Sequence, residues 1–327
     1  DIVMKADYPA ERRFWFDPPF HRGQSALLHK EADNVWRLDF QLGWEADPEE
    51  ERKPENVVRR VRQMLGSDVE FELEWASVYQ FACRRVDRFR HDRILFAGDA
   101  AHQVSPFGAR GANTGIQDVD NLAWKLALVI QGKAPATLLD SYHEERAFAA
   151  DDNIRQSTRS TDFITPKNRA SRHYRDAVLE LARQEAFARP LVNSGRLSTP
   201  TPYLQSSLNT PDESPFAGAM RPGTNCADAP ILRNGRPGWL LEELGKGFVL
   251  MTVGRPEAPE GIEVEGVWAP VLSIGHDVFS PENVLADRYD MQPGTVYLIR
   301  PDQHVAARWR RFDRSKARAA LARCLGH

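Results

Sequence analysis

The fold of this chain is decided by one stretch, Arg93-Ile94-Leu95-Phe96-Ala97-Gly98-Asp99-Ala100-Ala101-His102, which continues as Pro106-Phe107-Gly108-Ala109-Arg110-Gly111-Ala112-Asn113-Thr114-Gly115. Residues 94–97 form a short apolar run of the kind found in buried strands. Gly98 ends the run, and Asp99 follows at the carboxyl end of the expected strand, where ligands of open α/β sheets bind. A carboxylate in this place can accept hydrogen bonds from two hydroxyl groups of a ribose or ribityl chain.

The residues after this strand predict a tight loop and then a helix. Gly108, Gly111 and Gly115 allow sharp turns and a close approach of the backbone to a flat ligand. From about Asn113, apolar residues recur at helical spacing, namely Ile116, Val119, Ala123, Leu126, Ala127 and Ile130. The N–H groups of the loop and of the helix N-terminus suit an electron-rich or anionic group. The alternative is a strand-to-helix turn that binds no ligand.

This stretch resembles the second FAD fingerprint of the flavoprotein aromatic hydroxylases, in which a Gly-Asp pair precedes a Pro-containing Gly-rich loop and a helix. Members that act on hydroxyphenylpropionate-type phenols are the most similar. The match continues through Asp118, Asn121, Leu122, Trp124 and Lys125. The resemblance implies that the Gly98-Asp99 motif binds FAD, with Asp99 on the ribityl chain, and that Pro106 lies by the reacting face of the flavin.

The resemblance also assigns roles to the loop. It places the backbone of Gly111, Ala112 and Asn113 along the pyrimidine edge of the flavin, and Gly108 belongs to the same cofactor-binding loop. Arg110 lies either near this electronegative edge or in a surface ion pair. His102 either polarises a substrate oxygen or caps the turn, and we favour the structural role.

Composition excludes several functional classes. The chain has 327 residues, enough for about two domains, with 42% hydrophobic and 27% charged residues, as in ordinary globular proteins. A net charge of -3 without a basic stripe argues against a nucleic-acid partner. The three cysteines are far apart, so no metal site is predicted and a cytoplasmic location fits. No apolar run reaches the roughly 18 residues of a membrane span.

The predicted fold class is α/β, with a partial, Rossmann-like FAD-binding domain, a substrate-covering β-sheet and a C-terminal domain that resembles thioredoxin. We assign residues 1–82 to the sheet, 83–190 to the C-terminal part of the FAD-binding domain, 191–238 to a linker and 239–327 to the thioredoxin-like domain. The linker is rich in Ser, Thr, Pro and Gly. The last domain has no Cys-x-x-Cys, so we expect a structural or subunit-contact role without disulfide exchange, and a homodimer stays an open alternative.

The N-terminal half contains further recognisable elements. Residues 25–29 and 35–40 predict a hairpin, 55–65 a helix and 70–81 a strand. Trp75, Tyr79 and Phe81 on that last segment are candidates for a phenol pocket, with burial in the sheet core as the more common alternative. Helices are expected at 137–161 and 171–188. Glu145 and Arg146 are adjacent and do not share a helix face, so we expect each to bond to a different neighbour in a structural role.

The C-terminal region predicts a small α/β unit. We expect helices at 239–244 and 315–325, strands at 248–253 and 266–274, and a β-hairpin formed by 295–300 and 305–309. The chain contains no Gly-x-Gly-x-x-Gly. We therefore expect it to be the C-terminal portion of a longer hydroxylase and to bind FAD weakly or not at all by itself.

The resemblance implies an FAD-dependent monooxygenase that hydroxylates a phenolic aromatic compound. NADH or NADPH would reduce the FAD, and O2 would form a flavin C4a-hydroperoxide whose distal oxygen is transferred to the ring. Partners would be the small aromatic substrate and O2. Two alternatives stay open: a flavin oxygenase of the same fold that tailors a polyketide or another polycyclic aromatic, and a non-catalytic binding or assembly module.

Overall fold

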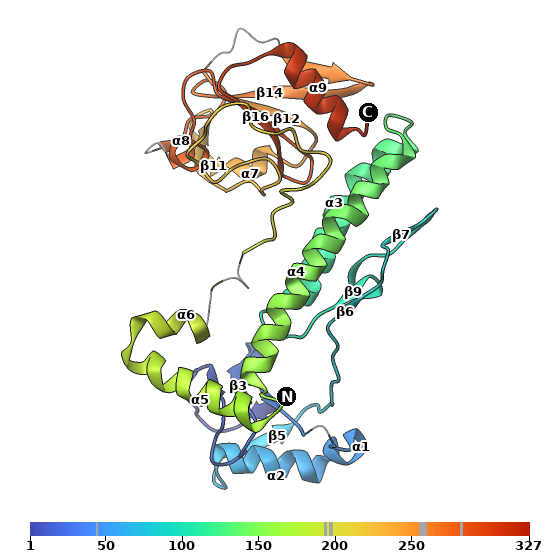
Figure 1. The fold of residues 1–327 in the computed structure, drawn as a ribbon. Helices are drawn as coiled ribbons and strands as arrows, with labels where there is room; N and C mark the ends of the chain where they lie inside the picture. Colours follow the sequence, from blue (N-terminus) through green and yellow to red (C-terminus); the bar gives the residue numbers. More distant parts are fainter. Residues whose placement is uncertain (44, 193–194, 196–198, 255–259, 282–283) are drawn as a thin grey trace. The chain divides into compact units, whose positions relative to one another are not determined.

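The computed structural model describes residues 1–43, 45–192, 195, 199–254, 260–281 and 284–327. They form a mixed α/β structure with two compact units (Figure 1). The first unit contains Asp1–Ala82 and Ser157–Gly195, and the second contains Cys83–Gln156 and Arg196–His327. None of the helices in these described ranges combines the length and the apolar character that crossing a membrane requires.

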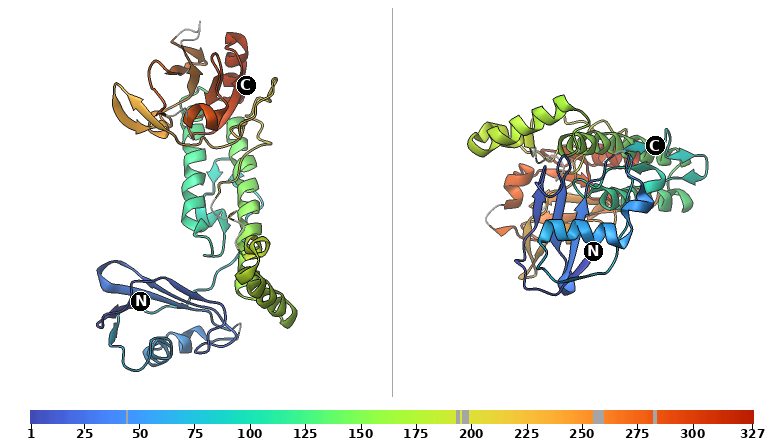
Figure 2. Two further views of the ribbon diagram at one scale, coloured as in Figure 1. Left: turned by 90° about the vertical axis from the view of Figure 1, so that its left-hand side faces the viewer. Right: turned by 90° about the horizontal axis from the view of Figure 1, so that it is seen from below.

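The first unit is built on a five-stranded antiparallel sheet of order β2-β3-β4-β1-β5. Its strands are β1 (Ile2–Met4), β2 (Arg13–Trp15), β3 (Ala26–Lys30), β4 (Val35–Phe40) and β5 (Phe71–Leu73). β3 and β4 form the predicted hairpin, which is confirmed. Helix α2 (Pro54–Leu65) covers one face of this sheet (Figure 2) and also confirms a prediction. Val61 of α2 packs there against buried Leu28 and Trp36.

The strand predicted at residues 70–81 is wrong beyond Leu73. Strand β1 begins at Ile2, which pairs with Leu73, so the ladder has no partner residues further along. Trp75 instead donates its backbone N–H to the carbonyl oxygen of Asp1 over 3.2 Å. The side chains of Trp75, Tyr79 and Phe81 are 51%, 62% and 46% exposed, so their assignment to a sheet core is also wrong.

Helices complete the first unit. α1 (Pro48–Glu51) precedes α2, and α5 (Arg169–Gln184) and α6 (Arg189–Val192) follow the long helix α4 (Asp140–Ile164). The side chain of Asn168 caps α5 by accepting the Ser171 N–H over 2.9 Å. The helices predicted at 137–161 and 171–188 correspond to α4 and α5, with ends shifted by a few residues. α4 passes from the second unit into the first at the boundary between Gln156 and Ser157.

In the second unit, α3 (Arg110–Ile130) and α4 lie side by side (Figures 1 and 2). Short strand pairs precede α3: β6 (Arg84–Arg85) with β9 (His102–Gln103), and β7 (Arg90–His91) with β8 (Ile94–Leu95). The predicted helix is confirmed, but its apolar stripe lies outward. Ile116, Val119 and Ile130 are 67%, 57% and 76% exposed, whereas the buried residues of α3 are polar.

The C-terminal part of this unit contains a five-stranded sheet of order β13-β14-β12-β15-β16. The strands are β12 (Val249–Val253), β13 (Gly261–Val264), β14 (Val267–Ile274), β15 (Val296–Ile299) and β16 (Val305–Trp309). β12 and β14 are parallel, and the other neighbours are antiparallel. The strands predicted at 248–253 and 266–274 and the hairpin at 295–309 are therefore confirmed.

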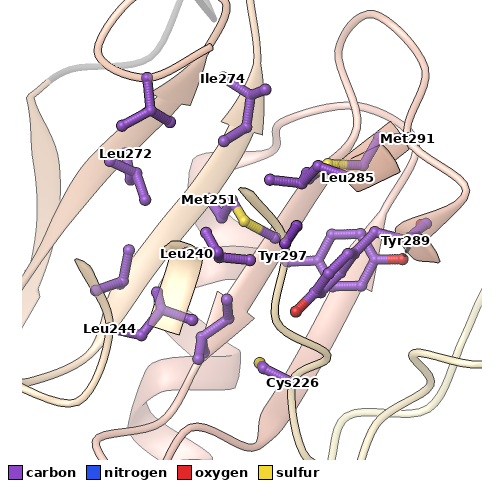
Figure 3. Packing of buried hydrophobic residues seen from close by; sticks show 14 of the residues in the cluster. Cys226, Leu240, Leu244, Met251, Leu272, Ile274, Leu285, Tyr289, Met291 and Tyr297 are labelled. Carbon is purple, nitrogen blue, oxygen red and sulfur yellow. Dashed lines mark hydrogen bonds between the residues drawn. The ribbon is translucent and has the colours of Figure 1, made fainter. Parts of the chain in front are cut away.

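Alternating side chains give this sheet two apolar faces. On one face, Met251 and Tyr297 pack with Leu285 and Tyr289 of α8 (Val284–Tyr289), as Figure 3 shows. The other face is covered by α9 (Arg314–Cys324), as predicted for residues 315–325. A smaller hairpin, β10 (Pro230–Arg233) with β11 (Arg236–Trp239), leads into α7 (Leu240–Glu243), which corresponds to the helix expected at 239–244.

Candidate functional site

The Gly-Asp motif lies in a short helical turn and not at the tip of a buried strand. β8 contains only Ile94 and Leu95, it pairs with β7 as a small hairpin, and Ile94 is 60% exposed. A strand is therefore present at Ile94–Leu95, but the predicted length to residue 97 and the predicted burial are wrong. The apolar run is too short to extend the pairing past Leu95, and the chain enters a 3-10 turn at Gly98–Ala100.

Asp99 occupies this turn with an exposed side chain. Its carboxylate accepts no hydrogen bond and forms no ion pair with any residue that the structure describes. It is therefore free to accept hydrogen bonds from the hydroxyl groups of a ligand. Pro106, the predicted residue by the reacting face of the flavin, is likewise exposed on the loop that follows.

The loop leads into an uncapped helix N-terminus. Gly108 and Ala109 have positive φ values of 90° and 53°, and α3 begins at Arg110 without a capping side chain. The first N–H groups of α3 therefore lack the side-chain acceptor that a capping residue supplies. The backbone positions of Gly111 and Ala112 belong to this first turn. Such a terminus attracts electron density or negative charge.

Two glycines hold the motif close to α3. A Cβ atom added to Gly115 would lie 3.3 Å from the Cα of Gly98, which itself has a φ of 59°. Any larger residue at position 115 would push the turn away from the helix. Gly115 therefore allows the 98–100 turn to pack closely on α3. The sequence suggested a different reason for this glycine, namely close contact with a flat ligand.

The structure places the remaining loop residues differently. Asn113 is exposed, and its side-chain amide donates to the Ala109 carbonyl over 2.6 Å. Arg110 is 7% exposed, so its assignment to a surface ion pair is wrong. Its guanidinium donates to the side-chain oxygen of Asn153 on α4 and, over 3.1 Å, to the Thr199 carbonyl.

Behind the exposed turn lies a buried polar cluster centred on Asp118, which is 0% exposed. Its Oδ2 accepts hydrogen bonds from the Gly98 N–H over 2.8 Å and from His102 Nε2 over 2.7 Å. Its Oδ1 accepts a bond from Arg146 Nε over 2.6 Å. Burial alone would raise the pKa of Asp118, but the hydrogen bond from His102 and the charge of Arg146 outweigh it and lower this pKa. The carboxylate is thus ionised at neutral pH.

His102 has the structural role that we favoured. It is 3% exposed, its Nε2–H donates to Asp118, and its ring stacks on Phe89 with 5.8 Å between centroids. Its Nδ1 atom is buried and has no hydrogen-bond partner among the described residues.

A second buried cluster joins α3 and α4 to the C-terminal sheet. Glu145 accepts two hydrogen bonds from Arg300, at 2.5 and 2.9 Å, and one from Lys125 at 2.8 Å. Arg300 also forms two bonds with Asp302. Burial would raise the pKa of Glu145, but the charges of Arg300 and Lys125 lower it. Burial lowers the pKa of Lys125 to about 8, although Glu145 acts in the opposite direction.

Glu145 and Arg146 thus bond to different neighbours, as predicted. The sequence does not reveal the partners, because Glu145 and Arg300 are 155 positions apart. One available signal was the spacing of Asp118, Asn121 and Lys125, which places three polar side chains on one helix face. Tyr203, whose hydroxyl accepts a bond from Arg146 over 2.6 Å, has no such signal.

The three predicted substrate residues lie in the first unit. Trp75 and Tyr79 are near each other, with ring centroids 6.3 Å apart. Their exposure leaves their faces available for an aromatic ligand, and a phenol pocket stays a prediction.

Comparison with known proteins gives these features a context. Residues 18–157 match the family model described as "FAD binding domain". The chain is 36% identical over 236 residues to an aromatic compound monooxygenase of Bacillus subtilis, covering 71% of this chain and 43% of the relative. It is 34% identical to a 3-(3-hydroxy-phenyl)propionate/3-hydroxycinnamic acid hydroxylase of Comamonas testosteroni, covering 89% of this chain and 60% of the relative. The chain spans about half the length of the curated relatives it matches.

Solved structures agree on the fold. The flavin-dependent monooxygenase PieE, solved with FAD and substrate, superposes with a TM-score of 0.74 at 22% identity and covers 99% of this chain and 62% of PieE. Aklavinone-11 hydroxylase, solved with FAD and aklavinone, gives 0.73 at 23% identity, with 93% and 57% coverage. The chain is thus similar in sequence to FAD-dependent aromatic hydroxylases, and its residues 18–157 match the model of an FAD binding domain.

Proposed function

We propose that the protein containing this chain is an FAD-dependent monooxygenase that hydroxylates a phenolic aromatic substrate with NADH or NADPH and O2. The observation that carries the proposal is the exposed carboxylate of Asp99, which has no hydrogen-bond partner among the described residues and lies in a turn that packs on Gly115 of α3, whose N-terminus has no capping side chain. These two features supply, within one loop, acceptors for hydroxyl groups and donors for an electron-rich ring edge. The similarity to hydroxylases that act on hydroxyphenylpropionates supports a phenolic substrate.

The residues of the loop fit part of FAD. Asp99 would accept hydrogen bonds from the ribityl hydroxyls, and the first N–H groups of α3, at Gly111 and Ala112, would face the ring edge. Asn113 lies in the same turn, and Gly108 shapes the entry to it. Pro106 would contact the flavin ring. When bound, FAD would supply the redox chemistry that activates O2.

Removing the Asp99 carboxylate tests this proposal. A hydrogen bond to a charged group is worth about 1.5–3 kcal/mol, so Asp99→Ala should weaken FAD binding roughly 10- to 100-fold. The matched control is Asp92→Asn, because Asp92 is another exposed carboxylate, lies outside the 98–100 turn and has a φ of 53° that Asn tolerates. Titration of flavin fluorescence gives both dissociation constants. An Asp99→Ala protein that binds FAD as tightly as the unchanged protein would refute the assignment.

A second candidate is the hydroxylation of a polycyclic aromatic or polyketide. It is supported by the structural similarity to an enzyme solved with aklavinone. The two candidates differ in a direct assay. Phenol-dependent oxidation of NADH or NADPH with formation of a catechol supports the first, and turnover confined to polycyclic substrates supports the second. Trp75, Tyr79 and Phe81 are our candidates for substrate contacts in either case.

We also infer that residues 239–327 form a thioredoxin-like domain, with 1–82, 83–190 and 191–238 as the sheet, the FAD-binding part and the linker. The parallel pair β12–β14 beside the antiparallel hairpin β15–β16, followed by α9, supports this. Because the domain lacks Cys-x-x-Cys, reduction of insulin disulfides should not be accelerated, and measurable turnover would contradict a purely structural role. A cytoplasmic location and a homodimer are further proposals, which cell fractionation and light scattering would test.

A further inference from the structure

The position of Asp99 depends on the backbone of the turn alone. Its side chain has no hydrogen-bond partner among the described residues, so side-chain contacts do not orient it. Within the turn, the Ala101 N–H donates to the Gly98 carbonyl over 2.8 Å, and the Val86 N–H donates to the Ala101 carbonyl over 2.9 Å. Whatever holds the two ends of residues 98–102 therefore determines where the Asp99 carboxylate lies.

Both ends of this segment are bound to one atom. Asp118 Oδ2 accepts from the Gly98 N–H over 2.8 Å at the beginning and contacts His102 Nε2 over 2.7 Å at the end. Asp118 lies on α3, which begins at Arg110, in the third turn of the helix. The carboxylate thus couples the motif that carries Asp99 to the helix whose N–H groups form the other half of the candidate site.

Asp118 itself is firmly held. Its other oxygen accepts from Arg146 Nε over 2.6 Å, and Arg146 donates further to the Thr114 carbonyl over 3.1 Å and the Tyr203 hydroxyl over 2.6 Å. Asp118 and Arg146 are 0% and 1% exposed, so water does not compete for these bonds. A buried carboxylate with a fixed counter-charge keeps its place better than one that reaches solvent.

We propose that Asp118 is a positioning residue, which closes residues 98–102 and thereby presents Asp99 to the ribityl hydroxyls of the cofactor. The inference rests on the proposed function and adds to it a residue that is not expected to touch the cofactor. A merely structural Asp118 would affect stability without a selective effect on the turn. Positioning predicts that the turn loosens and FAD binding weakens together, beyond any loss of overall stability.

The test compares two buried carboxylates in the protein that contains this chain. Asp118→Asn removes the charge behind the turn. Glu145→Gln is the matched control, because the Glu145 side chain is also fully buried and bound by cationic side chains, but its hydrogen bonds come from Asn121, Lys125, Ser206 and Arg300 and not from residues 98–102. A third variant, His102→Phe, removes one end of the closure but keeps an aromatic ring against Phe89. It serves if Asp118→Asn does not fold.

Three quantities are measured for each variant: hydrogen exchange of the amides at 98–102 without cofactor, the FAD dissociation constant, and the denaturation midpoint. In Asp118→Asn and His102→Phe, hydrogen exchange of these amides should be about tenfold faster or more. Both variants should also bind FAD about tenfold more weakly, as expected for lost bonds to a charged group. Glu145→Gln should leave both quantities within about twofold, even where its denaturation midpoint falls further.

The outcomes separate this inference from the proposed function. Unchanged amide exchange at 98–102 in Asp118→Asn, or in His102→Phe if the former does not fold, overturns the closure whatever happens to FAD. Faster exchange with unchanged FAD affinity overturns the positioning role, provided that Asp99→Ala weakens FAD binding. If Asp99→Ala also leaves the affinity unchanged, the proposed function fails, and the positioning role fails with it.

Discussion

Replacing Arg300 by Met should destabilise the second unit strongly. The Arg300 side chain is 0% exposed and forms two hydrogen bonds each with Glu145 and Asp302. Met has a similar length and fills most of the space, so the principal loss is electrostatic. Two carboxylates would remain buried, with Lys125 bonded to Glu145 and His304 beside Asp302 as the remaining basic side chains.

The magnitude follows from the burial of these partners. Removing one partner of a buried ion pair typically costs about 3–5 kcal/mol, because the remaining charge keeps its desolvation penalty. Two carboxylates are affected here, but Glu145 keeps bonds from Lys125, Asn121 and Ser206. We therefore expect a loss of about 3–5 kcal/mol, a large share of the roughly 5–15 kcal/mol that stabilises a typical domain.

Urea denaturation followed by tryptophan fluorescence measures this loss. The matched control is Arg85→Met, because Arg85 binds Asp151 through two hydrogen bonds but both side chains reach solvent, with 27% and 48% exposure. The control should lose less than about 1 kcal/mol. The double variant Arg300→Met with Glu145→Met should lose less than the sum of the two single variants. An Arg300→Met protein no less stable than the Arg85→Met control would refute the reasoning.

Three further outcomes are expected. The pKa values of Asp118, Glu145 and Asp302 are lowered in the folded protein. The stability that these carboxylates contribute is therefore present above the unfolded pKa values of about 3.9 to 4.3 and is lost as the pH falls below those values. A melting temperature that stays constant from pH 5 to pH 3 would contradict this. Gly115→Ala should lower the free energy of unfolding in urea titrations, because the added Cβ would lie 3.3 Å from the Cα of Gly98. A Cβ added at Gly111 meets no atom within 4 Å, so Gly111→Ala should raise the free energy of unfolding by about 1 kcal/mol. The chain purified alone should retain little FAD, because it spans about half the length of the relatives it matches and the loop at 98–113 would, in the proposed function, hold only part of the cofactor; a stoichiometrically yellow preparation would contradict this.

Local sequence signals predicted most of the elements. The hairpin of β3 and β4, helices α2 to α5 and the strands of the C-terminal sheet follow from apolar periodicity and turn residues, which act over a few positions. The failures have one physical source. The alternation after Leu73 and the apolar run at 94–97 both look like strands, but a strand also needs a neighbour to pair with. Neither segment has one over its full length.

Helix α3 shows how tertiary contacts reverse a pattern. Its apolar stripe through Ile116 and Val119 is the expected core side, yet these residues are exposed and Asp118, Asn121 and Lys125 are buried. Periodicity identifies two faces but not which one meets the rest of the unit. The buried face is chosen by charged partners on α4 and on the strand-to-strand turn at 300–302, which the sequence does not place nearby. Asp99 is identified as a candidate from the residues next to it in sequence, whereas the bonds of Asp118 to Gly98, His102 and Arg146 join residues 16 to 28 positions apart and are not visible in the sequence.

Glu145 and Arg146 place the two buried clusters at neighbouring positions of one helix. As neighbours on α4 they point in different directions, Glu145 toward Arg300 next to β15 and Arg146 toward Asp118 behind the 98–102 segment. Tyr203 lies between the clusters, since its hydroxyl binds Arg146 and its ring stacks on His304 with 4.6 Å between centroids. Because both charged side chains are buried, loss of the partner of either one would leave an unpaired buried charge. Helix α4 is therefore anchored twice, to the C-terminal sheet through Glu145 and to α3 through Arg146, and a change at Glu145 can lower stability without loosening residues 98–102.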